Sequence, residues 1–157
     1  MDSAEIERDA ITRLVRELGA GGATRVASPE EVARLREFFG RRVLRSYVDP
    51  YVLAKFHKHV EDDLHWPEDT AAEEYLESLR ETVLDSASSI YLTDDTESGE
   101  WALYFVGRVR RAWRGPRGSN RVVVIFNGER HRLVTGFQPV TDDAYVERQN
   151  GFWIRQR

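Results

Sequence analysis

The sequence predicts an α+β fold in which helices of the first half pack on a four-stranded antiparallel sheet formed by the second half. Apolar residues recur with a period near 3.6 up to residue 88 and with a period near 2 after it. Turn-forming residues divide the later part into four short apolar runs. A block of helices followed by a block of strands is typical of the α+β class, with the helices on one face of the sheet.

The totals predict one soluble domain. The chain has 157 residues, of which 41% are hydrophobic, and this suits a single packed core. No apolar run approaches the roughly 18 residues of a transmembrane helix, and the acidic, amphipathic start "MDSAEIERDAITR" is unlike a signal peptide. The absence of cysteine excludes disulfides and thiolate chemistry. We expect a single domain over residues 1–157, with an acidic helical segment at 1–45 and an α+β core at 46–157.

The first two helices are marked by spacing and by capping residues. Residues 4–18 repeat apolar side chains every three or four positions and are followed by "GAGG". Residues 28–40 begin with Ser28 as the N-cap, and Glu31 completes a capping box. Gly40 is the expected end of this second helix.

Two further helices are expected before residue 88. The segment 49–64 can begin on Asp49 and then present apolar side chains to a core at helical spacing. The segment 70–86 begins with Thr70 and Glu73 in a second capping-box pattern. Both segments therefore supply amphipathic helices that need the sheet as a partner.

The second half predicts strands separated by turn residues. The "NG" at 127–128 is a strong hairpin signal and predicts a tight turn between the third and fourth strands. Residues 141–151 predict a short last helix or turn, and residues 152–157 a final extended segment. The four strands are expected at residues 89–93, 100–113, 121–128 and 130–137.

The strand predicted at 100–113 has two different faces. Large apolar side chains at alternate positions from Trp101 onward form the better candidate for the helix-covered core. Tyr104, Arg108 and Arg110 are then expected on the opposite, open face. An aromatic ring beside two guanidinium groups can stack a base and bind a phosphate.

Charge is divided unevenly along the chain. Residues 101–157 carry eleven arginines and four acidic residues, a formal charge of +7, and residues 1–100 carry −11. Between residues 101 and 139 eight arginines face a single acid, Glu129. This excess predicts a surface that binds a polyanion, and charge complementarity between the two halves is the alternative.

Three of the four histidines lie in "AKFHKHVEDDLHWPED", residues 54–69. His57, His59 and His65 with a neighbouring aspartate offer ligand types that suit zinc. However, side chains two residues apart on a helix point in nearly opposite directions, so His57 and His59 would not share an ion. An imidazole can instead act as a general acid or base near neutral pH without a cofactor. The remaining alternative is that these histidines are polar residues of a helix surface.

The order of motifs resembles a nuclease family. A "KH" followed by an apolar residue, then a tryptophan, the capped helix "TAAEEYLESLRET" and a meander ending in "LVTGF" are similar to the phage and polymorphic-toxin branch of the barnase, EndoU, colicin and RelE-like (BECR) nucleases. The resemblance covers roughly residues 50 to 140. Phe137 departs from the family, which often has an aromatic residue with a hydroxyl there, and Tyr145 is the alternative source of that group.

The resemblance implies a set of site residues. His59 matches the family's histidine as general base or acid, and His57 would share that work. Arg108 and Arg110 would stabilise the phosphate, and Thr135 would hydrogen-bond a phosphoryl oxygen. By strand alternation His131 is expected to share a face with Thr135 while Arg132 takes the other. The candidate substrate-binding residues are Tyr104, His131, Arg132 and Tyr145.

The activity that the resemblance implies is metal-independent RNA cleavage by a toxin effector. Attack by the 2′-hydroxyl would give a 2′,3′-cyclic phosphate, with RNA such as tRNA as substrate and with neither a cofactor nor a metal ion. An immunity or antitoxin protein is the implied partner. The enzyme would act in a cytoplasm, and delivery or secretion within a larger toxin system is compatible with this role.

Three other functions fit the same sequence. An interaction protein of the immunity or antitoxin type would use acidic helices to mask a basic enzyme. An RNA-binding module would use the arginines on phosphates and leave the histidines without a role. A metal-dependent hydrolase would use the histidines as ligands.

Overall fold

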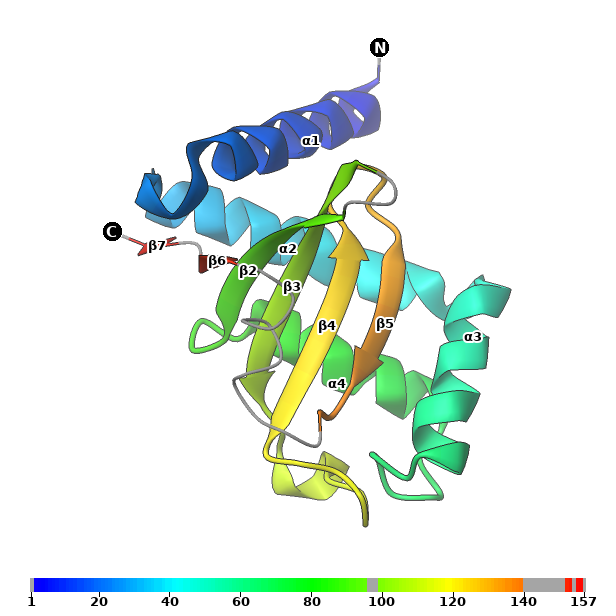
Figure 1. Ribbon diagram of the computed structural model, residues 1–157. Coiled ribbons are helices and arrows are strands. Elements are labelled where there is room, and N and C mark those ends of the chain that lie inside the picture. The colour runs from blue at the N-terminus through cyan, green and yellow to red at the C-terminus, as the bar shows by residue number, and fades with distance from the viewer. Residues whose placement is uncertain (1, 96–98, 140–151, 154, 157) are drawn as a thin grey trace.

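The computed structural model describes residues 2–95, 99–139, 152–153 and 155–156, and its fold is α+β as predicted (Figure 1). The helices are α1 (Ser3–Gly21), α2 (Pro29–Arg45), α3 (Pro50–Phe56) and α4 (Ala72–Leu84), and the π-helix η3 (His57–Asp62) follows α3 directly. Figure 1 shows α2 and α4 behind the sheet, α1 across one end of it, and α3 at one side. None of the described helices combines the length and the apolar character that a transmembrane span needs.

The predicted antiparallel meander is confirmed and extended by one strand. Its strands are β2 (Ser89–Asp95), β3 (Glu100–Arg108), β4 (Arg121–Asn127) and β5 (Leu133–Phe137), and β6 (Phe152–Trp153) pairs antiparallel with β2. The sheet order is β5-β4-β3-β2-β6. A separate parallel pair joins β1 (Val26–Ala27) to β7 (Arg155–Gln156). The second predicted strand, 100–113, is shorter than expected, because β3 ends at Arg108.

The start of α2 was predicted correctly and its end was not. Ser28 and Glu31 form the capping box, each bonding the other's backbone N–H. The helix nevertheless continues through Gly40 to Arg45. A Cβ atom at Gly40 would lie 2.8 Å from Leu84 Cδ2 on α4, so this glycine permits close packing of two helices. The glycine is therefore a contact residue inside the helix.

The β4–β5 hairpin is wider than the tight turn that "NG" predicted. Residues 128–132 separate the two strands. The Asn127 side chain accepts hydrogen bonds from the N–H groups of Glu129 and Arg130 and so organises the turn. His131 adopts a φ of 67°, in the left-handed region.

The start of α4 is displaced by one residue from the prediction. The Glu74 carboxylate accepts a hydrogen bond from the Ala71 N–H, 3.1 Å away, where Thr70 and Glu73 were expected to form the capping box.

The expectation of an acidic segment at residues 1–45 is also wrong. That segment has nine arginines and eight acidic residues, and the acidic excess lies between residues 46 and 100.

Both faces of the sheet are buried near its centre. Leu103 and Phe105 of β3 face the helices as predicted and belong to the main core. Tyr104, Val123 and Ile125 form a second apolar cluster on the opposite face, and each is at most 7% exposed. The nearly continuous apolar run of β4, "RVVVIF", is the sequence pattern of a strand that is covered on both sides.

Candidate functional site

The histidine segment is helical and sorts its side chains by direction. Within η3 the Asp63 N–H donates to the Lys58 carbonyl, 2.8 Å away, which is the i to i+5 bond of a π-helix. His57 is exposed and lies 3.0 Å from Glu61. His59 is only 6% exposed. The prediction that His57 shares the work of His59 therefore finds no support in the contacts of the described residues.

His59 joins η3 to strand β5 through two hydrogen bonds. Its Nδ1 lies 3.1 Å from an Asp63 carboxylate oxygen, and its Nε2 lies 2.9 Å from the Thr135 hydroxyl. A carboxylate only accepts hydrogen bonds, so we assign the proton of the neutral ring to Nδ1. Nε2 then carries the lone pair and accepts the Thr135 O–H. The structure thus brings together His59 and Thr135, which are 76 residues apart and were both predicted site residues.

Neighbouring contacts fix the position of Thr135. The buried Tyr75 hydroxyl of α4 donates to the Gly136 carbonyl, 2.6 Å away. A Cβ atom at Gly136 would lie 2.4 Å from Leu79 Cδ2, so a larger residue fits between β5 and α4 only if Leu79 shifts. The "TG" of "LVTGF" therefore holds the hydroxyl of Thr135 through the packing of the next residue.

His65 is a member of the site that the sequence analysis considered only as a possible zinc ligand. Leu64 has a φ of 55°, and this left-handed residue turns the chain back so that the His65 N–H donates to the His59 carbonyl at 2.9 Å. The two imidazole rings stack at 5.6 Å with an angle of 13° between them. His65 Nδ1 accepts from the Gln138 N–H at 3.3 Å. No pattern in the sequence signals the turn at Leu64.

Burial keeps the two stacked histidines neutral. It lowers the pKa of His59 from 6.5 to about 4, and the hydrogen bond with Asp63 offsets only part of that effect. Burial also lowers the pKa of His65. Near pH 7 His59 is thus unprotonated and is able to accept a proton at Nε2.

His59, Asp63 and His65 also have side chains of the types that bind metal ions. One ligand atom each from His59, Asp63 and His65 lies within 4.8 Å of the others. The two imidazole rings are nearly parallel, so their in-plane lone pairs run side by side. Both nitrogens of His59 and Nδ1 of His65 already have partners. The arrangement fits a hydrogen-bonded relay better than a metal centre.

An arginine-rich loop docks beside this cluster through its backbone. The loop, residues 109–120 between β3 and β4, donates from the Gly115 N–H to the His65 carbonyl at 2.7 Å and from the Arg117 N–H to the Leu64 carbonyl at 3.0 Å. A Cβ atom at Gly115 would lie 2.4 Å from the Leu64 carbonyl oxygen. The "RGPRG" that the prediction treated as a separator therefore attaches to the turn that carries His65.

The loop carries basic side chains that the prediction did not single out. Arg111, Arg114 and Arg117 are exposed. Arg114 bonds the side chain of Asn120, and none of the three forms an ion pair with a described residue. The excess of arginines over acids between residues 101 and 139 is the sequence signal that includes them.

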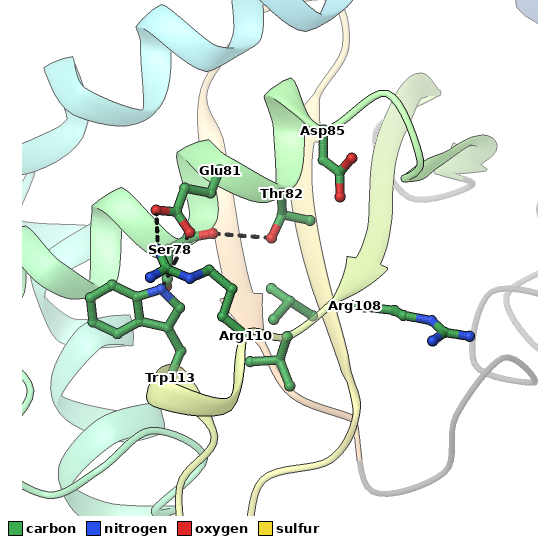
Figure 2. Close-up of a pocket in the computed structure, with 9 residues that line it drawn as sticks. Ser78, Glu81, Thr82, Asp85, Arg108, Arg110 and Trp113 are labelled. Atoms are coloured by element: carbon green, nitrogen blue, oxygen red, sulfur yellow. Dashed lines mark hydrogen bonds and ion pairs between the residues drawn. The ribbon is translucent and has the colours of Figure 1, made fainter.

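Arg108 and Arg110 differ from each other in their surroundings. A cavity of about 220 Å³ lies between α4 and the end of β3. In this cavity Arg110 and Trp113 both point to Glu81 (Figure 2). Arg110 lies 2.7 Å from a Glu81 carboxylate oxygen, on the helix side. The expectation that Arg110 shares the open face with Tyr104 is wrong, because β3 ends at Arg108 and the alternation ends with it. The exposed Arg108 side chain points away from Glu81 (Figure 2).

Two of the predicted substrate-binding residues are buried. Tyr104 lies on the predicted face but is 7% exposed, so its ring is not open for a base to stack on. His131 lies outside β5, and its ring packs against Phe38 at 4.8 Å and bonds the Thr12 hydroxyl at 2.9 Å. The prediction that His131 shares a face with Thr135 is wrong, because its left-handed backbone breaks the strand alternation.

The other two predicted substrate-binding residues are Arg132 and Tyr145. Arg132 is exposed but is bound to Asp49 through two hydrogen bonds of 3.2 Å and lies over the Tyr51 ring. Its guanidinium is thus engaged with a carboxylate and an aromatic face. Tyr145 lies outside the described residues.

Comparisons of the chain with protein-family models, with curated proteins and with solved structures find no match. The resemblance to the BECR nucleases therefore remains a prediction from short motifs. We therefore infer function from the geometry of the site itself.

Proposed function

We propose that the protein is a metal-independent endoribonuclease, of the toxin-effector type, in which His59 is the general base. The observation that carries this proposal is the pair of hydrogen bonds that place His59 Nε2 against Thr135 and Nδ1 against Asp63. A buried imidazole held in one tautomer by a carboxylate is suited to accept a proton. The exposed arginines of the docked loop next to it supply the electrostatic attraction that an RNA backbone needs.

Each group has one role in the proposed reaction. Nε2 of His59 accepts the proton of the ribose 2′-hydroxyl, whose oxygen attacks the adjacent phosphorus. The P–O5′ bond breaks, a 2′,3′-cyclic phosphate forms, the 5′-oxygen takes up a proton from water, and His59 returns its proton to the solvent. The Thr135 hydroxyl turns from Nε2 to a phosphoryl oxygen, and arginines of the loop offset the growing negative charge. His65 holds the His59 ring in place by stacking.

The test is cleavage of total RNA and of a labelled tRNA in excess EDTA, followed by analysis of the fragment ends. Wild-type protein should produce cyclic phosphates. His59→Ala should be slower by about 10² to 10⁴, as expected on removal of a general base. His57→Ala is the matched control, because it removes an exposed imidazole of the same helix and should retain activity.

Three results would contradict the proposal. Intact RNA with the wild type would remove it for those substrates, and activity that EDTA abolishes would favour a metal centre at His59, Asp63 and His65. Equal activity of wild type and His59→Ala would exclude His59 as the base. The interaction-protein and RNA-binding alternatives both predict intact RNA, and only the second predicts binding that weakens steeply with salt.

A second candidate function uses the same relay with Thr135 as nucleophile. Hydroxyl, imidazole and carboxylate are hydrogen-bonded in series, the arrangement of nucleophilic hydrolases. The Thr135 oxygen would attack an ester carbonyl, an alcohol would leave, and water would release the acyl group. A burst of about one equivalent of nitrophenol from p-nitrophenyl acetate, lost in Thr135→Val, would favour this function over RNA cleavage.

A further inference from the structure

A second basic site lies far along the chain from the histidine cluster, between α1 and α2. A cavity of about 220 Å³ there is lined by the start of α1 and the last two turns of α2. Four of its lining residues are arginines and one is an acid. The lining residues are Ser3, Ala4, Glu7, Arg8, Phe38, Arg41, Arg42 and Arg45.

The arginines of this pocket are not matched by acids. Glu7 is bound to Arg41. Arg8, Arg42 and Arg45 form no ion pair with any residue that the structure describes. The lining thus holds three positive charges in excess, although residues 1–45 as a whole are almost neutral.

The three unmatched arginines repel one another. Burial lowers the pKa of Arg42, and the charges of Arg45 and Arg8 lower it further. Arg42 is partly buried, and its Nε–H reaches the His131 carbonyl only at 3.4 Å. Arrangements of like charges are costly for the folded state unless an anion occupies the space between them.

The size and the chemistry of the pocket restrict the anion. Phe38 forms an apolar floor, with the guanidinium carbons of Arg41 and Arg42 about 6 Å from its ring centre. Planar guanidinium groups bind phosphate oxygens through paired N–H bonds.

We infer that this arginine pocket binds a terminal, doubly charged phosphate group, either free phosphate or the phosphomonoester of a small molecule such as a nucleotide. A cavity of this volume holds a phosphate with part of a sugar and is too small for a folded nucleic acid. The site goes beyond RNA cleavage and does not depend on it.

The experiment is isothermal titration calorimetry of the full chain with inorganic phosphate and with adenosine 5′-monophosphate in phosphate-free buffer. Arg45→Gln should weaken binding by about tenfold or more, since one charge-assisted hydrogen-bonding group is lost. Arg8→Gln/Arg45→Gln should weaken it by about a hundredfold. Arg34→Gln is the matched control, because it removes an exposed arginine of α2 that does not line this pocket. Tighter binding of the monophosphate would identify an ester as the ligand, and equal affinity would identify free phosphate.

Thermal unfolding gives a second readout. A purely structural role of Arg45 would lower the melting temperature of Arg45→Gln, whereas a role in phosphate binding would not. Without phosphate, Arg45→Gln should melt at the same or a higher temperature than wild type, because a repulsive charge is removed. At the same phosphate concentration, wild type and Arg34→Gln should gain more melting temperature than Arg45→Gln. The inference is overturned if neither ligand binds wild-type protein, if Arg45→Gln binds as tightly as wild type, or if Arg45→Gln melts lower in phosphate-free buffer.

Discussion

His131 should make the stability of the protein depend on pH. It is 4% exposed, and burial together with the charges of Arg42 and Arg8 lowers its pKa to about 4. Its pKa in the unfolded chain is about 6.5, so the unfolded state binds the proton more tightly. The contribution of the neutral ring is therefore fully present above about pH 6.5 and is lost as the pH falls towards 4. At 1.36 kcal/mol per unit, the loss between pH 7.5 and 4.5 is about 2 to 3 kcal/mol.

The assay is urea unfolding of wild type and His131→Asn at both pH values. Asparagine tolerates the φ of 67° and does not titrate in this range, so the variant should lose about 2 to 3 kcal/mol less than wild type between the two pH values. Contributions of His59 and of the carboxylates occur in both proteins and cancel. His57→Asn makes the same change at an exposed position and should behave as wild type. Equal pH dependence of wild type and His131→Asn would refute the reasoning.

Three further predictions concern the site and its support. Thr135→Val should slow RNA cleavage by about tenfold or more while Thr135→Ser retains most activity, and equal rates for both would remove the hydroxyl from the mechanism. Arg117→Gln, in a His59→Ala background, should reduce the slope of log affinity against log salt for single-stranded RNA by about 0.7, and an unchanged slope would show that this arginine contacts no phosphate. Gly136→Ala should destabilise the fold by about 1 to 3 kcal/mol in urea unfolding because its Cβ overlaps Leu79, and an unchanged midpoint would mean that Leu79 moves aside freely.

The parts of the fold that sequence predicted correctly are those determined by local chemistry. The capping box of Ser28 and Glu31 depends on neighbouring residues in the first turn of one helix, so α2 begins where expected. The end of the same helix depends on a contact between Gly40 and Leu84, 44 residues later in the chain, and reading Gly40 as a stop failed. Likewise "NG" describes a preference of two residues, whereas the register of β4 and β5 requires a five-residue connection.

The site shows the same division between local and distant information. His59 and Thr135 were identified through motifs, and the structure brings them within hydrogen-bonding distance. The stacking of His65 on His59 was missed because it depends on a left-handed leucine, Leu64, a conformation that the residue type does not favour. Tyr104 was placed on the correct face of the sheet, but its side chain was expected to be exposed. Alternation along one strand shows which side chains share a face, and it does not show whether that face is covered.

The docking of the β3–β4 loop has an evolutionary consequence. Main-chain atoms of Gly115 and Arg117 form its attachment to the turn at Leu64 and His65. Side chains at the exposed loop positions are therefore free to be exchanged while the attachment is kept, provided that glycine remains where the two backbones meet. Such a loop can diversify its chemistry among descendants without disturbing the histidine cluster beneath it.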